Sequence, residues 1–277
     1  MMLYILKTTI CFTLFLAFYK LLLEKESMHV FKRFYLIASL IIAFIIPSIV
    51  FTEYVYIDPQ PSIQSYVPEF ALNEFQATPI SEKTDYLNII LWSIYGLGVM
   101  VFGFKFLQNL FKIGNRITKN PKIKKQHITN VLLQEKLAPH TFFNFIFLNK
   151  QKYEAHEIPT EVLLHEQTHA DQKHSIDVLF IEFIHVLLWF NPLVYVYKRA
   201  IKLNHEFLAD YAVVQNGIET TRYQKILLAF SSNASYQETA LTNAINYSSI
   251  KKRFTVMKTN TSKKAIWLRS LLVLPLV

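Results

Sequence analysis

Three apolar runs are the feature that most limits what this chain can fold into. They cover residues 3–23, 34–51 and 86–107, and most charged residues lie outside them. A helix of about 20 apolar residues crosses the hydrocarbon core of a bilayer. The chain is also 52% hydrophobic and contains few glycines. The sequence therefore predicts an integral membrane protein that is mainly α-helical, with three transmembrane helices.

The charges between these runs predict an orientation. Segment 24–33 contains Lys25, Lys32 and Arg33, whereas segment 52–85 contains one lysine and six acidic residues. Segment 108–125 is again basic. Because lysine and arginine accumulate in cytoplasmic loops, residues 52–85 are expected outside and the N-terminus is expected outside as well. The same rule explains the net charge of +9 without direct nucleic-acid binding, for which no recognition pattern is present.

A fourth apolar run, residues 176–197, conflicts with that orientation if it crosses the membrane. The basic residues that follow it would then lie outside, against the charge rule. Asn191-Pro192 interrupts the run, and proline favours a helix start over a helix interior. We therefore expect two packed helices, about 175–190 and 192–215, with no crossing. Another apolar run begins at Ala265 and continues to Val277, and it is interpreted as the start of a fourth transmembrane helix.

His165, Glu166 and His169 form the pattern H-E-x-x-H within the stretch LLHEQTHADQKH. On a helix, residues four apart share one face, so both histidines can bind a single zinc ion. Glu166 lies beside them and can act as the general base toward the metal-activated water. The sequence thus predicts a catalytic site with one Zn²⁺ ion.

A catalytic zinc site needs a third protein ligand, and the stretch NHEFLADYAVV offers one. Glu206 and Asp210 are four apart on a predicted helix. Glu206 can complete a His-His-Glu set, and Asp210 can accept a hydrogen bond from the far nitrogen of a ligand histidine. An acidic pair with this spacing is usually a solvated helix face. When such a pair follows H-E-x-x-H by about forty residues, however, the combination is a fairly specific signal for a zinc site. All three ligands must lie on one side of the membrane, which also argues against a crossing between them.

The stretches HEQTH, FIHVLLWFNPLVYVYKRA, HEFLAD and APHTFFNFIFLNKQ resemble the BlaR/MecR-type receptor metallopeptidases, which are membrane gluzincins of bacteria. The resemblance implies a multi-pass protein of the cytoplasmic membrane with its zinc protease domain in the cytoplasm. It also implies a protein or peptide substrate, since known members cleave themselves and a transcriptional repressor. Those members sense β-lactams, but the sequence supplies no penicillin-binding sensor domain, so β-lactam sensing is not supported.

The expected organisation follows. Residues 1–110 form the membrane region with the outer loop 52–85, residues 111–264 form the cytoplasmic zinc protease domain, and residues 265–277 begin the last span. Two β-prone runs, 131–135 and 143–148, are expected to give the protease domain a small sheet. An edge strand of that sheet could pair with an extended substrate, or the second run could be core alone. The apolar runs are expected to contact the lipid bilayer. For the oligomeric state, a homodimer is among the alternatives.

Several assignments stay open. His205, His174 and Tyr211 are candidates for the donor that stabilises the oxyanion, and for His205 a structural role is favoured. An HtpX-like quality-control protease is a second enzyme hypothesis, although such enzymes usually place two spans between the histidines and the glutamate. A receptor or scaffold that keeps the fold without proteolysis is the non-enzyme alternative, and the intact Glu166 argues against it.

Overall fold

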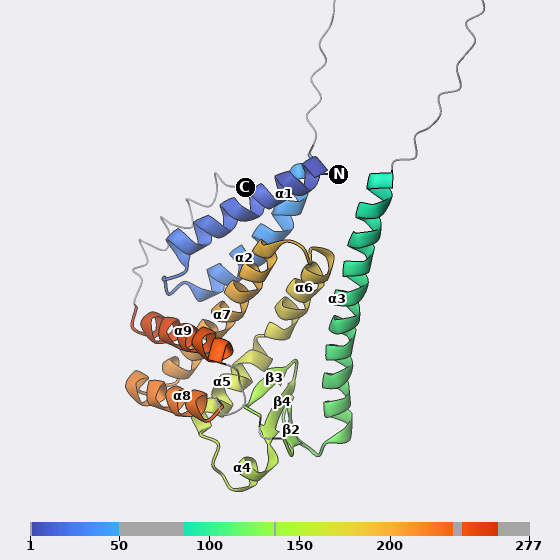
Figure 1. Ribbon diagram of the computed structural model, residues 1–277. Helices are drawn as coiled ribbons and strands as arrows, with labels where there is room; N and C mark the ends of the chain where they lie inside the picture. Colours follow the sequence, from blue (N-terminus) through green and yellow to red (C-terminus); the bar gives the residue numbers. More distant parts are fainter. Residues whose placement is uncertain (1, 50–85, 136, 235–239, 260–277) are drawn as a thin grey trace, which may run out of the picture.

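The computed structural model describes residues 2–49, 86–135, 137–234 and 240–259 (Figure 1). Over these residues the protein is mainly helical and carries one small four-stranded mixed sheet, which confirms the predicted fold class. The segment predicted as an outer loop, 52–85, and the last apolar run, 265–277, lie outside the described residues.

Within the part of the chain that the structure describes, three helices are long and apolar enough to cross a membrane, as predicted. The first comprises α1 (Met2–Phe18) and a π-helical turn (Tyr19–Leu23), and the second comprises α2 (His29–Ile45) and a 3₁₀ turn (Ile46–Ser48). The third, α3 (Tyr86–Lys119), extends twelve residues beyond the predicted span. Its added turns carry Ile113 and Ile117, which pack on the sheet, so contact with the sheet keeps this charged segment helical.

The sheet has the strand order β1-β2-β4-β3. It comprises β1 (Lys122–Lys125), β2 (Ile128–Leu133), β3 (His140–Phe142) and β4 (Phe145–Asn149). The pairs β1–β2 and β3–β4 are antiparallel, whereas β2–β4 is parallel. The two predicted β-prone runs become the inner strands β2 and β4. The edge strands β1 and β3 were missed because one is an exposed lysine-rich segment and the other has three residues.

Alternation along the inner strands divides their side chains between two cores. Ile128, Leu132, Ile146 and Leu148 pack toward Val162 of α5 (Thr160–Asp171), whereas Val131, Leu133 and Phe147 pack toward α3. Because successive residues of a strand point to opposite faces, the sheet holds α5 on one side and α3 on the other. The short helix α4 (Lys150–Glu154) leads from β4 toward α5.

The fourth apolar run forms the predicted pair of helices, α6 (His174–Leu187) and α7 (Pro192–Gln215). Asn191 caps α7, since its side chain accepts a hydrogen bond from the backbone N–H of Leu193 at 3.0 Å. Helix α7 runs alongside α2 and contacts α1, and α6 lies between α7 and α3 (Figure 1). A buried core joins Phe12 and Leu40 of the candidate spans to Ile181 and Tyr197 of this hairpin. The chain ends its described part with α8 (Thr220–Ala234) and α9 (Ala240–Met257), and α9 packs on α7.

Gly98 allows α3 to approach the tip of the hairpin. A Cβ atom at this position would lie 2.1 Å from the indole ring of Trp189, whereas one at Gly96 would meet nothing within 4 Å. The nearby hydroxyl of Tyr95 donates to the carbonyl of Leu187 at 3.1 Å. The contact between α3 and α6 therefore depends on the absence of a side chain at Gly98.

We expect Gly98→Ala to lower the free energy of unfolding by about 1–3 kcal/mol, the usual cost of overpacking. Gly96→Ala is the matched control and should leave stability unchanged or slightly raised, because alanine favours the helix. Thermal unfolding of the detergent-solubilised protein, followed by tryptophan fluorescence, measures both. Equal melting temperatures for the two variants would contradict the proposed contact.

Candidate metal centre

Helix α5 presents both histidines of the H-E-x-x-H motif on one face. His165 and His169 are one turn apart, and their Nε2 atoms lie 3.1 Å from each other. Their imidazole centroids are 4.8 Å apart. Two ring nitrogens that converge in this way present two lone pairs to one point, which is what a shared cation requires.

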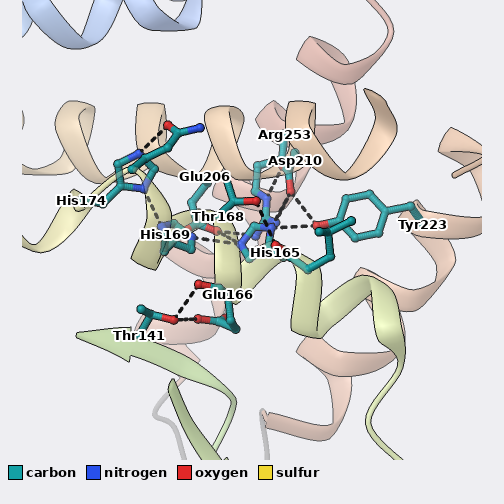
Figure 2. A network of polar contacts seen from close by, with 12 residues as sticks. Thr141, His165, Glu166, Thr168, His169, His174, Glu206, Asp210, Tyr223 and Arg253 are labelled. Carbon is teal, nitrogen blue, oxygen red and sulfur yellow. Dashed lines mark hydrogen bonds and ion pairs between the residues drawn. The ribbon is translucent and has the colours of Figure 1, made fainter. Parts of the chain in front are cut away.

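Glu206 of α7 joins them (Figure 2). Its Oε2 lies 3.4 Å from His165 Nε2, and its Oε1 lies 3.6 Å from His169 Nε2. One ligand atom from each of the three residues lies within 4.8 Å of the others. Two imidazole nitrogens and one carboxylate oxygen form a donor set that fits Zn²⁺ and leaves a fourth position for water or substrate.

Asp210 lies one turn beyond Glu206, on the far side of His165. Its Oδ1 is 3.3 Å from His165 Nδ1, but the hydroxyl of Tyr223 lies closer to that nitrogen, at 2.8 Å. Tyr223 in turn donates to Asp210 Oδ1 at 2.9 Å. Tyr223 of α8, a residue that the sequence reasoning missed, therefore contacts both His165 and Asp210 at shorter distances than the direct contact between those two residues.

Arg253 of α9 is the second residue that was missed. Its Nη1 lies 2.8 Å from Glu206 Oε2, its Nε donates to Asp210 Oδ2 at 2.8 Å, and its Nη2 donates to Asp210 Oδ1 at 2.5 Å. One guanidinium group thus bridges the third ligand and the carboxylate behind His165 (Figure 2). A bidentate arginine fixes both carboxylates in position as well as neutralising them.

Glu166 lies between the two histidines and Thr141 of the sheet (Figure 2). The hydroxyl of Thr141 donates to Glu166 Oε2 at 2.7 Å, and the same hydroxyl lies 3.0 Å from the Glu166 carbonyl oxygen. Thr141 belongs to the edge strand β3. The strand next to α5 therefore fixes the carboxylate that the sequence assigns as the general base.

The electrostatic environment suits a metal. Burial acts to raise the pKa of Glu206 and Asp210, but the Arg253 charge outweighs it and lowers both, that of Glu206 well below its usual range. Burial lowers the pKa of His169 to about 4. Burial also acts to lower the pKa of His165, but hydrogen bonding to Asp210 and Glu206 raises it to about 9. A ligand histidine binds metal in its neutral form, so metal binding at His165 is expected to depend on pH.

Burial raises the pKa of Glu166, against the opposing effects of His165 and Thr141. A carboxyl group with a raised pKa exchanges protons more readily near neutral pH, as a general base and later general acid must. The position of Glu166 inside a buried, polar site is thus compatible with the role assigned from sequence.

The three candidate oxyanion donors lie in different surroundings. His174 and His205 line a cleft of about 240 Å³ that also reaches His169 and Glu206. His174 contacts His169 and Gln172 through its two ring nitrogens, and His205 contacts Asp177 through Nε2. These contacts fit an orienting role. The side chain of Tyr211 is exposed, and its ring packs near His29 instead of the ligand cluster.

The fold and this cluster together define a class: a helical protein with candidate membrane spans and a metal cluster consistent with an HExxH-plus-Glu zinc peptidase. Residues 141–257 match the family described as BlaR1 peptidase M56. Through this segment the chain is similar to the BlaR1-type M56 peptidases, which confirms the resemblance predicted from the motifs.

Two curated proteins show the same relationship. The regulatory protein BlaR1 of Staphylococcus aureus is 22% identical over 164 residues, which cover 49% of this chain and 26% of that protein. The regulatory protein BlaR1 of Bacillus licheniformis is 31% identical over 123 residues, which cover 42% of this chain and 20% of that protein. The similar region therefore spans about a quarter or less of these relatives.

Asp210→Asn is expected to weaken zinc binding by about 10- to 100-fold, because outer partners of ligand histidines typically contribute that much. Asp171→Asn provides the control: Asp171 ends the same helix α5 but contacts the exposed His127. Competition titration against a fluorescent zinc chelator measures both dissociation constants. Wild-type affinity in Asp210→Asn would show that Asp210 does not support the ligand.

Proposed function

We propose that this chain is a membrane-bound zinc endopeptidase that acts in transmembrane signalling by cleaving itself, a regulatory protein such as a transcriptional repressor, or both. The observation that carries the proposal is the convergence of His165 and His169 with Glu206, a residue from a different helix. The M56 family match over residues 141–257 supports the same reaction class. In this proposal residues 1–110 are the membrane region and residues 111–264 are the peptidase domain.

His165, His169 and Glu206 would hold the zinc ion. When bound, zinc supplies Lewis-acid polarisation of the scissile carbonyl and of the attacking water. Glu166 takes the proton from that water and later delivers it to the leaving amine. Thr141 orients the Glu166 carboxylate, and Tyr223 with Asp210 fixes the ring of His165.

The edge strand β3 gives the substrate a place to bind. It ends the strand order of the sheet, and all three of its residues line the cleft beside His169 and Glu206. An extended peptide can add to such an edge through main-chain hydrogen bonds. The proposed substrate strand therefore lies against β3, with its scissile bond between Glu166 and the metal ligands. The inner strand β4, which contains most of the predicted β-prone run 143–148, is paired on both sides.

Glu166→Gln should retain zinc and lose at least about 100-fold in proteolytic rate, the lower part of the range for general acid–base catalysis. The measurement uses the full chain in lipid nanodiscs, with metal content, release of fluorescein from labelled casein, and mass spectrometry of fragments of the chain itself. Glu154→Gln, on the exposed side of α4, is the control and should cleave as wild type does. Undiminished cleavage by Glu166→Gln would overturn its role, and a zinc-loaded wild type that cleaves neither target would favour the silent receptor or scaffold.

The active site is proposed to face the cytoplasm, with the N-terminus and residues 52–85 outside. The support is the concentration of lysine and arginine in residues 24–33 and 108–125 together with the positive-inside rule. Both ends of the α6–α7 hairpin lie near the metal ligands, since His174 contacts His169 and α7 carries Glu206. A hairpin of this kind keeps all ligands on one side.

This orientation predicts which cysteines an impermeant maleimide can label. In a Cys11→Ser background, Glu154→Cys should react in inside-out vesicles but not in intact spheroplasts, and Ser62→Cys should react in intact spheroplasts. Gel shift with a polyethylene-glycol maleimide gives the readout. The opposite pattern would place the peptidase outside.

A further inference from the structure

A buried polar chain connects a candidate membrane span to the metal ligands. It begins at Arg33 in α2, where Nε lies 2.6 Å from Asp177 Oδ2 and Nη2 donates to Asp177 Oδ1 at 3.2 Å. The side chain of Asp177 is 7% exposed and that of Arg33 is 19% exposed. A two-point contact between a planar guanidinium and a carboxylate fixes orientation as well as distance. The start of α2 is thereby tied to the first turn of α6.

Asp177 also receives a second donor. His205 Nε2 lies 2.8 Å from Asp177 Oδ2, so one carboxylate joins α2 to both α6 and α7. His205 stacks flat on His174, with the ring centroids 4.1 Å apart and an angle of 10° between the planes. Both histidines are buried, so neither ring can rotate without disturbing the other.

His174 then contacts the ligand His169. Their Nδ1 atoms lie 2.8 Å apart, while His174 Nε2 lies 3.1 Å from Gln172 Oε1. If His169 binds metal through Nε2, its Nδ1 carries the proton and donates to His174 Nδ1, and His174 in turn donates to Gln172 through Nε2. This assignment satisfies each of these contacts with neutral rings. Figure 2 shows His174 beside His169, on the side away from His165.

We propose that Arg33 is a positioning residue for the metal centre: it orients the ligand His169 through Asp177, His205 and His174. The proposal rests on the proposed zinc site and adds a membrane helix to it. Without Arg33, the buried carboxylate of Asp177 loses its bidentate cation and becomes an uncompensated buried charge, which is destabilising. We expect the other contact of Asp177 to rearrange in response. That contact is with His205, whose ring supports His174.

A second contact from the same part of α2 reaches the third ligand's helix. Asn204 of α7 donates from its side chain to the carbonyl of His29 at 3.0 Å, and it lies two residues before Glu206. The His29 ring also packs near Phe207, with centroids 5.6 Å apart. The beginning of α2 therefore supports both helices that follow the H-E-x-x-H helix. A displacement of this span relative to α6 and α7 would act on His169 and Glu206 together.

Cobalt provides a test that requires no substrate. The full chain in nanodiscs is loaded with Co²⁺, whose visible absorption reports coordination geometry. Arg33→Met and Asp177→Asn should each raise the Co²⁺ dissociation constant about 10-fold, near the low end for outer partners, and should change the visible spectrum. The double variant should bind Co²⁺ no more weakly than either single variant, because the effects of residues that act through one hydrogen-bonded network are not additive. Arg33→Lys, which keeps the charge but loses the two-point contact, should recover only part of the affinity.

Arg116→Met is the matched control, since Arg116 forms an exposed ion pair with Glu135 and should bind Co²⁺ as wild type does. If Arg33→Met does not fold, Asp177→Asn decides. Wild-type affinity and spectrum in a folded Arg33→Met or Asp177→Asn would overturn the positioning role, and so would additive effects in the double variant. Failure of the zinc site itself looks different: the wild type would bind no Co²⁺, or His165→Ala would bind it equally well.

Discussion

The metal centre depends on a chain reversal. An apolar helical hairpin separates Glu206 from the two histidines in sequence, and its turn brings the glutamate back to them. His165 and His169 lie on α5, Glu206 lies on α7, and α6 intervenes. The hairpin can return only because Asn191-Pro192 ends one helix and starts the next, with the Asn191 side chain as cap. Ile181, Val194 and Tyr197 of the hairpin are then buried in one core with residues of α1 and α2. Metal geometry in this protein is therefore a consequence of helix packing beside the candidate membrane spans.

Asp210 connects the rest of the site to the C-terminal helices. This one carboxylate accepts hydrogen bonds from Tyr223 of α8 and from Arg253 of α9. It is buried, and its partners must supply the stabilisation that water would otherwise provide. Arg253 also neutralises Glu206. Helices α8 and α9 thus complete the polar surroundings of the metal ligands, although neither contributes to the ligand set.

The sequence predicts those parts of the site that are local. H-E-x-x-H and the spacing from Glu206 to Asp210 follow from the repeat of one helix, and the turn at Asn191-Pro192 follows from proline chemistry. Tyr223, Arg253 and Thr141 come from three other elements, and nothing in their local sequence distinguishes them. Arg253 lies in the basic stretch IKKRF, which is typical of a solvated segment. Strand β1 is equally hidden, because lysines suit an exposed edge strand and a loop alike.

The packing of the hairpin also explains why the run 176–197 is as apolar as a membrane span, although we expect no crossing there. Helices α6 and α7 bury Ile181, Val194 and Tyr197 among residues of α1 and α2, while Ile176 and Phe183 are exposed on the outer side. The one acidic residue deep in α6, Glu182, pairs with Lys198 at 2.7 Å and with Lys202 at 3.3 Å. A charge in such surroundings is tolerable when it is paired within the protein. The hairpin can therefore share the apolar environment of the spans. Because the hairpin shares its core with α2, a movement of α2 would also displace the metal ligands at its base.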